Sequence, residues 1–305
     1  MRIVRGLPSV PPERRPSAVA LGVFDGVHVG HRAILGAAVA HARASGGLAF
    51  VCTFEPHPLE VLQPGRAPLA ITTLDERLEL IAGCGVDGAV VLTFTRELAA
   101  VEPESFVKDV LVDRLAARQV VVGFNHRFGR GARGDAALLR SLGAQHGFSV
   151  DVIEPLSVDG VPVSSTAIRA ALERGDLASA ERMLGRPYTL PGKVVAGAGR
   201  GRTLGFPTAN IAPDRPVLVA PGVYACTAEV GGQGRRAVVN IGVRPTFGED
   251  TLAVEAYLLD FAGDLYGQTI RLIFVSRIRE ERRFPSVNAL RAQIADDVET
   301  ARKRL

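Results

Sequence analysis

The sequence predicts an α/β domain with a parallel sheet, followed by an all-β domain, a barrel or a sandwich, that ends in a helix. Two features of the pattern indicate this. Apolar, strand-like runs alternate with amphipathic, helix-like runs in the first part of the chain, whereas residues 188–280 hold short strands separated by glycine- and proline-rich turns. A chain of 305 residues is long enough for two separate cores. The change of pattern near Gly185–Pro187 predicts domains at residues 1–186 and 187–305.

The first domain contains five runs rich in β-branched and aromatic residues that we expect to be strands. Helices are expected between them because apolar residues recur there at three- and four-residue spacing. Strands that alternate with helices form crossover connections, and hence a parallel sheet covered on both faces. Such a sheet binds ligands beyond the carboxyl ends of its strands. The expected strands are residues 18–24, 48–54, 88–94, 119–124 and 148–155, and the expected helices are residues 32–44, 73–85, 103–116, 135–147 and 165–185.

The second domain contains alternating strand patterns without helices between them, which is typical of a barrel or a sandwich. A closing helix is expected at residues 286–305, with Ser286 as its N-cap. The expected strands are residues 188–197, 222–232, 235–243, 252–260 and 268–279.

Composition narrows the class of protein. Hydrophobic residues make up 47% of the chain and charged residues 22%, and no apolar run reaches the ~18–20 residues that span a bilayer. Residues 1–17 lack the apolar core and cleavage site of a signal peptide. Cys52, Cys84 and Cys226 are too few and too far apart for a disulfide framework or a zinc site. These features predict a cytoplasmic protein that does not bind a membrane.

The excess of positive charge leaves two classes of ligand open. A pI of about 9.2 suits a nucleic-acid-binding protein, but the formal net charge is only +4. Arginine forks bind phosphate through two N–H groups, so a phosphorylated small molecule explains the arginines equally well. Surfaces that bind single strands stack bases on aromatic rings, and this chain has no Trp and 4 Tyr. We therefore expect small-molecule substrates and no nucleic acid, with an RNA-binding or nucleotide-sensing module as the alternative.

Residues 21–31, LGVFDGVHVGH, lie where the first expected strand meets the first expected helix. The start of a helix offers unpaired N–H groups and a positive dipole end to an anion. His28 and His31 are three residues apart, so both rings can face the same side and donate hydrogen bonds to a triphosphate. A glycine-rich turn with two surface histidines is the simpler alternative. Zinc is a weaker one, because this spacing differs from the usual helical pair and no third ligand is near.

The segment GVFDGVHVGH, residues 22–31, resembles the HxGH signature of the adenylyltransferase superfamily in its flavin-specific form. Further segments resemble motifs of the prokaryotic bifunctional riboflavin kinase/FMN adenylyltransferases; they are residues 53–58, 121–135, 163–169, 197–211, 240–248 and 277–286. The resemblance implies a Rossmann-like sheet of the HxGH nucleotidyltransferase type and a riboflavin kinase β-barrel. It implies phosphorylation of riboflavin to FMN by ATP, then adenylylation of FMN to FAD with release of pyrophosphate. An enzyme with one inactive half is the nearest alternative.

For the first domain, the resemblance implies roles for three groups of residues. His28, His31 and Arg169 would stabilise the charge that develops during transfer. Flavin contacts are implied for Asn125, Arg127 and Phe128, whereas Phe124 and His126 occupy variable places in the motif. The residues implied in binding ATP and its phosphates are Gly22, Phe24, Asp25, Gly26, Gly30, Ser164, Ser165 and Thr166.

For the second domain, the resemblance implies a glycine-rich loop that covers the ATP phosphates, formed by Gly197, Gly199, Gly201 and their neighbours. Thr208 and Asn210 share one face of the next strand, bind ATP, and offer oxygens that suit Mg²⁺. Arg277 and Arg279 are implied as flavin contacts. Glu255 stands in an apolar strand, where a carboxylate is costly unless it is paired or used. Its implied role is that of a general base for the ribityl hydroxyl, at the mouth of the barrel.

Overall fold

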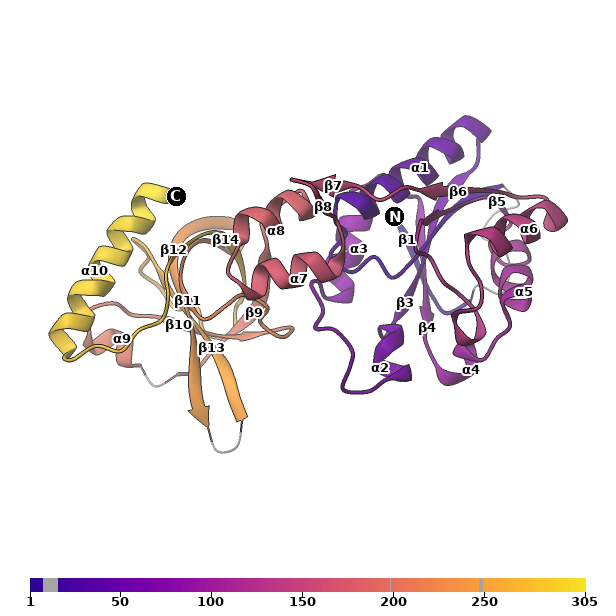
Figure 1. The fold of residues 1–305 in the computed structure, drawn as a ribbon. Coiled ribbons are helices and arrows are strands. Elements are labelled where there is room, and N and C mark those ends of the chain that lie inside the picture. Colours follow the sequence, from indigo (N-terminus) through magenta and orange to yellow (C-terminus); the bar gives the residue numbers. More distant parts are fainter. Residues whose placement is uncertain (8–15, 198, 247–248) are drawn as a thin grey trace. The chain divides into compact units, whose positions relative to one another are not determined.

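The computed structural model describes residues 1–7, 16–197, 199–246 and 249–305 (Figure 1). Phe247 and Gly248, which end the 240–248 motif, lie outside the described residues. The chain forms two compact units, Met1–Ser165 and Thr166–Leu305. No helix in the described ranges combines the length and the apolar character that crossing a bilayer requires.

The first unit is built on a six-stranded sheet in which all neighbouring strands are parallel, as the sequence predicts. In spatial order the strands are β1 (Arg2–Arg5), β4 (Gly88–Thr93), β3 (Leu48–Glu55), β2 (Ser17–Leu21), β5 (Ala117–Gly123) and β6 (Ser149–Ile153). The edge strand β1 is not among the predicted strands. Its four residues include two arginines and are mostly exposed, so they lack the apolar pattern of the other five.

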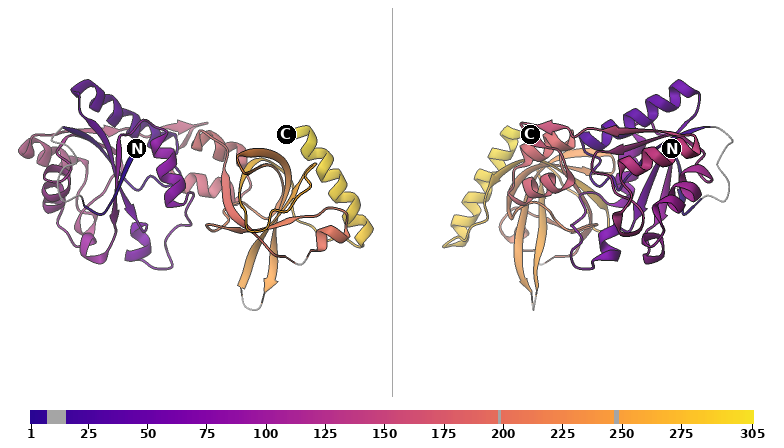
Figure 2. Two further views of the ribbon diagram at one scale, coloured as in Figure 1. Left: turned by 180° about the vertical axis from the view of Figure 1, so that it is seen from behind. Right: turned by 45° about the vertical axis from the view of Figure 1, so that its right-hand side comes forward.

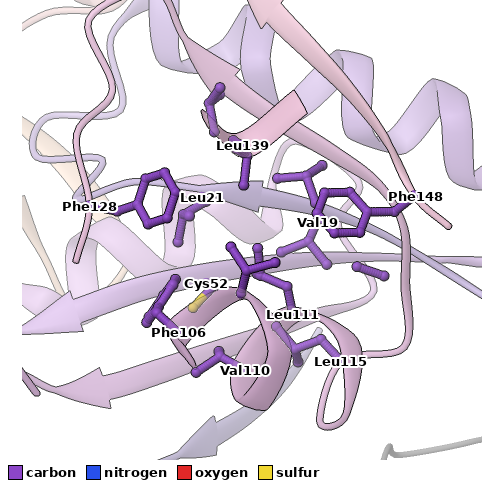
Figure 3. Close-up of a cluster of buried hydrophobic side chains, with 14 of the residues drawn as sticks. Val19, Leu21, Cys52, Phe106, Val110, Leu111, Leu115, Phe128, Leu139 and Phe148 are labelled. Carbon is purple, nitrogen blue, oxygen red and sulfur yellow. The ribbon is translucent and has the colours of Figure 1, made fainter. Parts of the chain in front are cut away.

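Helices cover both faces of this sheet, because successive residues of its strands point to opposite sides. Leu35 of α1 (Val29–Ser45) and Leu78 of α3 (Leu74–Ala82) belong to the core on one face. The core on the other face contains Leu139 of α6 (Ala136–His146) and Phe106 of α5 (Pro103–Phe106), as Figure 3 shows. A π-helical turn, Val107–Val112, follows α5 where the sequence predicts a single α-helix over residues 103–116.

The remaining elements of the first unit are short. They are α2 (Pro58–Leu62), α4 (Arg96–Ala99), a 3₁₀ turn at Arg130–Ala132, and the hairpin of β7 (Ser157–Val158) and β8 (Val161–Pro162).

The second unit is a closed antiparallel barrel, which decides between the barrel and the sandwich (Figure 2). Its strands in spatial order are β10 (Ala209–Pro213), β13 (Glu249–Leu258), β12 (Gln233–Thr246), β11 (Gly222–Val230), β14 (Thr269–Arg279) and β9 (Thr189–Val195). The terminal helix α10 (Val287–Arg304) begins as predicted, because the Ser286 hydroxyl accepts the N–H of Ala289 at 3.1 Å. The short helix α9 (Arg200–Thr203) precedes β10.

Two helices that precede the barrel in sequence belong to this second unit. They are α7 (Ser165–Glu173) and α8 (Leu177–Leu184). The N–H of Ala220 donates to the carbonyl of Leu172 at 3.1 Å, and α8 packs against β14. The two compact units divide between Ser165 and Thr166, after the first residue of α7, and the predicted domains 1–186 and 187–305 stay a prediction.

Candidate active sites

The histidine turn of the first unit, residues 22–31, leaves the carboxyl end of β2 in a strained conformation. Phe24, Gly26 and Val27 have φ angles of 58°, 82° and 39°. A positive φ is unusual for phenylalanine and for a β-branched valine, and such strain is found most often where a functional site depends on it. Both side chains are almost fully buried, so packing holds the turn in place.

His28 ends the turn as the N-cap of α1. Its Nδ1 accepts the backbone N–H of His31 at 3.2 Å. A neutral imidazole that accepts through Nδ1 carries its proton on Nε2, so its hydrogen-bond donor is Nε2–H. A Cβ on Gly30 would lie 3.2 Å from the His28 ring, which explains the glycine: it leaves room for the capping imidazole.

His31 stacks on His28, with ring centroids 3.5 Å apart and planes at 15°. The ring of Phe24 meets it edge-on at 5.2 Å. Burial holds the pKa of His31 well below its usual value, and the nearby His28 and Arg77 lower it further. His31 is therefore neutral at pH 7 and acts as a hydrogen-bond donor or acceptor rather than as a cation.

Asp25 organises the turn from the inside. Its carboxylate accepts the backbone N–H groups of Ile71 and Thr72 at 3.0 and 3.1 Å, and the Thr72 hydroxyl at 3.2 Å. The hydroxyl of Ser165 donates to the Asp25 carbonyl at 2.9 Å, which ties the last residue of the first unit to the histidine turn. The carboxylate predicted to bind ATP thus holds the segment before α3, and its contact with ATP stays a prediction.

Arg77 is a residue of this site that the sequence did not reveal. It lies on α3, only 4% exposed, and its Nη1 donates to the carbonyl of Val23 in the histidine turn at 3.0 Å. Arg77 was not identified from the sequence because an arginine within an amphipathic helix usually faces the solvent. The feature that could have identified it is its position between Glu76 and Leu78, on the buried face of the helix.

The predicted flavin-side residues divide into two groups. Asn125 and Arg127 are exposed beyond the carboxyl end of β5. Phe128 is 7% exposed and packs in the core with Phe106, their ring centroids 6.1 Å apart (Figure 3), so little of its ring is left for a ligand. His126 stacks on Phe128 at 5.8 Å, and burial lowers the pKa of His126 to about 4.

The remaining phosphate candidates of the 163–169 motif lie at the start of α7. Ser164 and Arg169 are half-buried and Thr166 is exposed. Ser165 belongs to the first compact unit, whereas Thr166 and Arg169 belong to the second.

The main cavity of the second unit has a volume of about 600 Å³ and lies against the wall of the barrel. Its polar lining includes Glu255 and Glu281, and Leu290, Ile294 and Asp297 of α10 also line it. Val223 and Val238 line it from β11 and β12 and pack against Val298 of α10 in one apolar cluster. The cavity therefore lies on the outer face of the barrel, beneath α10, rather than at the predicted barrel mouth.

Strand register places Glu255 at the centre of a polar row. Asn210 of β10 and Asn240 of β12 pair with it on either side, and all three line the cavity. Residues directly opposite on neighbouring strands have Cβ atoms ~4.5–5.5 Å apart, so the carboxylate lies between two amides. Its sequence neighbours Val254 and Ala256 are almost fully buried on the opposite face, whereas Glu255 itself is half-buried.

The two predicted flavin arginines have different surroundings. Arg279 lines the cavity and is bound to Asp297 of α10, with Nε to Oδ1 at 3.0 Å and Nη2 to Oδ2 at 2.8 Å. Arg277 is not among the described residues that line this cavity. Its Nη2 donates to the carbonyl of Pro221 at 2.7 Å, and its side chain lies 3.0 Å from the position of a Cβ on Gly175.

A second cavity, of about 360 Å³, opens on the opposite face of the same strands. Ala209, Ala256 and Leu258 line it, together with the rings of Phe261 and Tyr266. Thr208 lines both cavities.

The glycine-rich loop borders the larger cavity through two of its three predicted members, Gly199 and Gly201. A Cβ on Gly201 would lie 2.9 Å from the Thr208 hydroxyl. A Cβ on Gly197 would overlap the Asn210 amide, so this third glycine packs against that side chain.

Both sites suit phosphate chemistry. The first offers helix N–H groups and imidazoles to an anion, and the second sets a carboxylate beside amide and hydroxyl oxygens on a cavity wall. The class of protein is therefore a two-domain enzyme that transfers phosphate-containing groups.

Comparisons with known proteins identify the family. The profile of FAD synthetase matches residues 10–167, and that of riboflavin kinase matches residues 184–305. A bifunctional riboflavin kinase/FMN adenylyltransferase of Escherichia coli K12 is 41% identical over 99% of this chain and 97% of its own length. One from Pseudomonas fluorescens is 40% identical over 99% and 97%. The chain belongs to the family of bifunctional riboflavin kinase/FMN adenylyltransferases.

A solved structure from Streptococcus pneumoniae, described as a macrolide-efflux protein, has the same fold. It is 31% identical, with a TM-score of 0.91 over 99% of both chains.

Proposed function

We propose that this chain phosphorylates riboflavin with ATP to give FMN, and then transfers AMP from a second ATP to FMN to give FAD and pyrophosphate. Two family profiles, one for each activity, match consecutive parts of the chain and support both steps. The observation that carries the proposal is Glu255, set between two asparagines on a cavity wall in the riboflavin kinase part. We assign the adenylyltransferase to residues 1–186 and the kinase to residues 187–305.

In the kinase step, riboflavin occupies the larger cavity and the adenosine of ATP occupies the smaller one. Thr208 lines both cavities, which supports transfer of a phosphate from one to the other. Glu255 takes the proton of the terminal ribityl hydroxyl as its oxygen attacks the γ-phosphorus, and ADP leaves. Phe261 and Tyr266 offer aromatic surface to the adenine. Arg279, held by Asp297, borders the flavin.

The oxygen atoms of Thr208 and Asn210 in the kinase part suit Mg²⁺ as ligands. Among the described residues there is no group of three or more His, Cys, Asp or Glu residues that would form a protein cage for a metal. Mg²⁺ instead keeps several waters and binds through one or two protein oxygens and substrate phosphates. Thr208 and Asn210 supply such oxygens, and the absence of a Cβ on Gly201 leaves room beside the Thr208 hydroxyl. When bound, the ion would neutralise charge on the ATP phosphates.

In the adenylyl step, the phosphate of FMN is the nucleophile, so no covalent intermediate on the protein is needed. Its oxygen attacks the α-phosphorus of ATP, and pyrophosphate leaves. The chain contributes position and charge stabilisation: the N-terminal N–H groups of α1 and the imidazoles of His28 and His31 bind the triphosphate. Arg169 contributes a guanidinium to the phosphates, and Asn125 and Arg127 contact the flavin. We also propose a cytoplasmic location, which the three widely spaced cysteines support.

One incubation tests the proposal. Purified protein is mixed with riboflavin, ATP and Mg²⁺, and FMN and FAD are resolved by chromatography over time. We expect FMN to appear first and FAD to follow. A protein that accumulates FMN without FAD has only the kinase activity, and one that forms neither product lacks the kinase activity; the same incubation with FMN in place of riboflavin then tests the adenylyltransferase. A fragment of residues 187–305, compared with residues 166–305, then tests whether the kinase needs α7 and α8.

A further inference from the structure

The buried guanidinium of Arg77 connects the ends of two central strands. Its side chain is 5% exposed. Nη1 donates to the carbonyl of Val23, just after β2, at 3.0 Å, and Nη2 donates to the carbonyl of Phe54, at the end of β3, at 3.3 Å. Nη2 also pairs with the carboxylate of Glu55. Removing a charge from water is costly, so an arginine buried this deeply needs a reason beyond the packing of a helix.

The same helix holds the histidine turn at a second point. Just before α3, the Thr72 hydroxyl accepts the N–H of Gly26 at 3.1 Å, and the carboxylate of Asp25 accepts the Thr72 N–H. Together with the hydrogen bond from Arg77 to Val23, these bonds hold the turn in place on both sides of Phe24. Phe24 has a φ of 58° and contacts the ring of His31 at 5.2 Å. Loss of the hydrogen bonds made by either Arg77 or Thr72 would let the strained turn relax and move His31.

Two buried nitrogens near this contact have complementary hydrogen-bonding properties. In the part of the chain that the structure describes, Arg77 Nε and His31 Nδ1 are both buried and have no hydrogen-bond partner. The arginine nitrogen can only donate. The imidazole Nδ1 accepts only when the ring proton lies on Nε2. The positive charge of this guanidinium acts on the ring and opposes its protonated form. An N–H donor directed at Nδ1 favours the form in which Nδ1 is bare and Nε2 carries the proton.

The charges around His31 act in the same direction. Burial is the largest cause of its low pKa, followed by His28 and then Arg77. Three carboxylates lie near Arg77 or in the histidine turn: Glu55 is paired with Arg77, Asp25 accepts the N–H groups of Ile71 and Thr72, and Glu76 accepts the N–H of Thr73. A fixed positive charge on α3 therefore opposes protonation of the imidazole, even when an anionic substrate would attract a proton.

We propose that Arg77 is a positioning residue for His31: it holds the histidine turn in its strained shape and favours the neutral imidazole whose Nε2–H donates to the triphosphate. The inference rests on the proposed adenylyltransferase activity and adds to it a residue that touches no substrate. A neutral donor of fixed orientation stabilises charge in the transition state without first having to release a proton.

The test uses the full-length protein with Arg77→Gln, Arg77→Lys and the matched control Arg43→Gln. Arg43, at the other end of α1, also donates from two nitrogens, to Asp87 at 3.0 Å and to the Gly85 carbonyl at 3.3 Å. Three quantities are measured: FAD formation from FMN, FMN formation from riboflavin, and the titration and tautomer of His31 by ¹⁵N NMR.

We expect Arg77→Gln to slow FAD formation by about 10²-fold, the usual effect of a small misplacement of reacting groups. FMN formation should stay within about twofold, since the kinase site lies in the other unit. The His31 pKa should rise toward its usual value in Arg77→Gln and stay low in Arg77→Lys, which keeps the charge. Arg43→Gln should change neither FAD formation nor the His31 titration.

An unchanged His31 titration and tautomer in a folded Arg77→Gln would overturn the proposal. So would an equal loss of FAD formation in Arg43→Gln, because any buried or bridging arginine would then suffice. If Arg77→Gln does not fold, Arg77→Lys decides: a His31 titration that differs from wild type contradicts the role of the charge. A wild-type protein that forms no FAD refutes the proposed function instead, and the titrations still test the link between Arg77 and His31.

Discussion

Replacing Glu255 by glutamine tests the chemistry of the kinase cavity most directly. Glutamine has nearly the same shape as glutamate and can still hydrogen-bond the ribityl hydroxyl, but it cannot take a proton at neutral pH. Because Glu255 is half-buried on the cavity face between Asn210 and Asn240, the amide replaces the carboxylate without leaving a void. We therefore expect normal folding and nearly normal affinity for riboflavin and ATP.

The expected loss is in the rate of phosphate transfer. A positioned general base is worth ~10²–10⁴-fold, or about 3–5 kcal/mol of activation free energy. Single-turnover FMN formation measures this step, with both ligand affinities determined separately so that a binding defect is not mistaken for a chemical one. The matched control is Glu229→Gln, the same change on barrel strand β11 at a residue paired with Arg271 and not among the described lining of the cavity.

A fall of less than about threefold in a folded Glu255→Gln protein would refute the role of general base. A second refuting result would be a large loss in Glu281→Gln with none in Glu255→Gln, because Glu281 is another acid on the wall of this cavity. Adenylylation of supplied FMN should be unchanged in every one of these variants.

Three further predictions concern the other parts of the chain. His31→Ala removes a preorganised donor, so FAD formation should fall ~10²–10³-fold while FMN formation holds, and an unchanged FAD rate would make His31 a structural residue. The low pKa of His126 means that the unfolded chain binds a proton below about pH 6.5 but the folded chain does so only near pH 4. Stability of up to about 3 kcal/mol should be lost as pH falls through this range, and urea unfolding of His126→Phe should show a smaller loss. Asp297→Asn leaves Arg279 uncompensated on the cavity wall; it should destabilise the protein by about 3–5 kcal/mol and lower the Tm by on the order of 10 °C, and a Tm within about 2 °C of wild type would contradict this.

Local patterns in the sequence were enough to predict most of the elements of the fold. Alternation of apolar runs with amphipathic helices predicts a parallel sheet, and the structure confirms it. The terminal helix and its Ser286 N-cap are also confirmed. An N-cap hydrogen bond joins residues only three positions apart, so a local pattern can predict it. The strand β1 was missed because it is short, charged and exposed, and it is recognisable only by its pairing with β4.

The surroundings of the candidate residues depended on contacts that no local pattern records. The site of Arg77 is fixed by carbonyls that are 54 and 23 residues away in sequence. Phe128 lies in a motif that resembles a flavin-binding loop, yet its ring packs in the core because Phe106 and the sheet close around it. The position of Glu255 in an apolar strand is explained by the strand register. Its sequence neighbours face the interior of the barrel, whereas its carboxylate faces the cavity.

The pairing of β13 with its two neighbours has a consequence for how this part of the chain can change. Because side chains alternate along a strand, deleting one residue before Glu255 within β13 would turn its carboxylate toward the packed interior and bring a valine or an alanine to the cavity wall. This one deletion would then disrupt the core of the barrel and also remove the proposed general base from the cavity. Point substitutions can adjust this site one property at a time, whereas single-residue insertions and deletions along the strand cannot. Changes in length should accumulate only in the turns that join the strands.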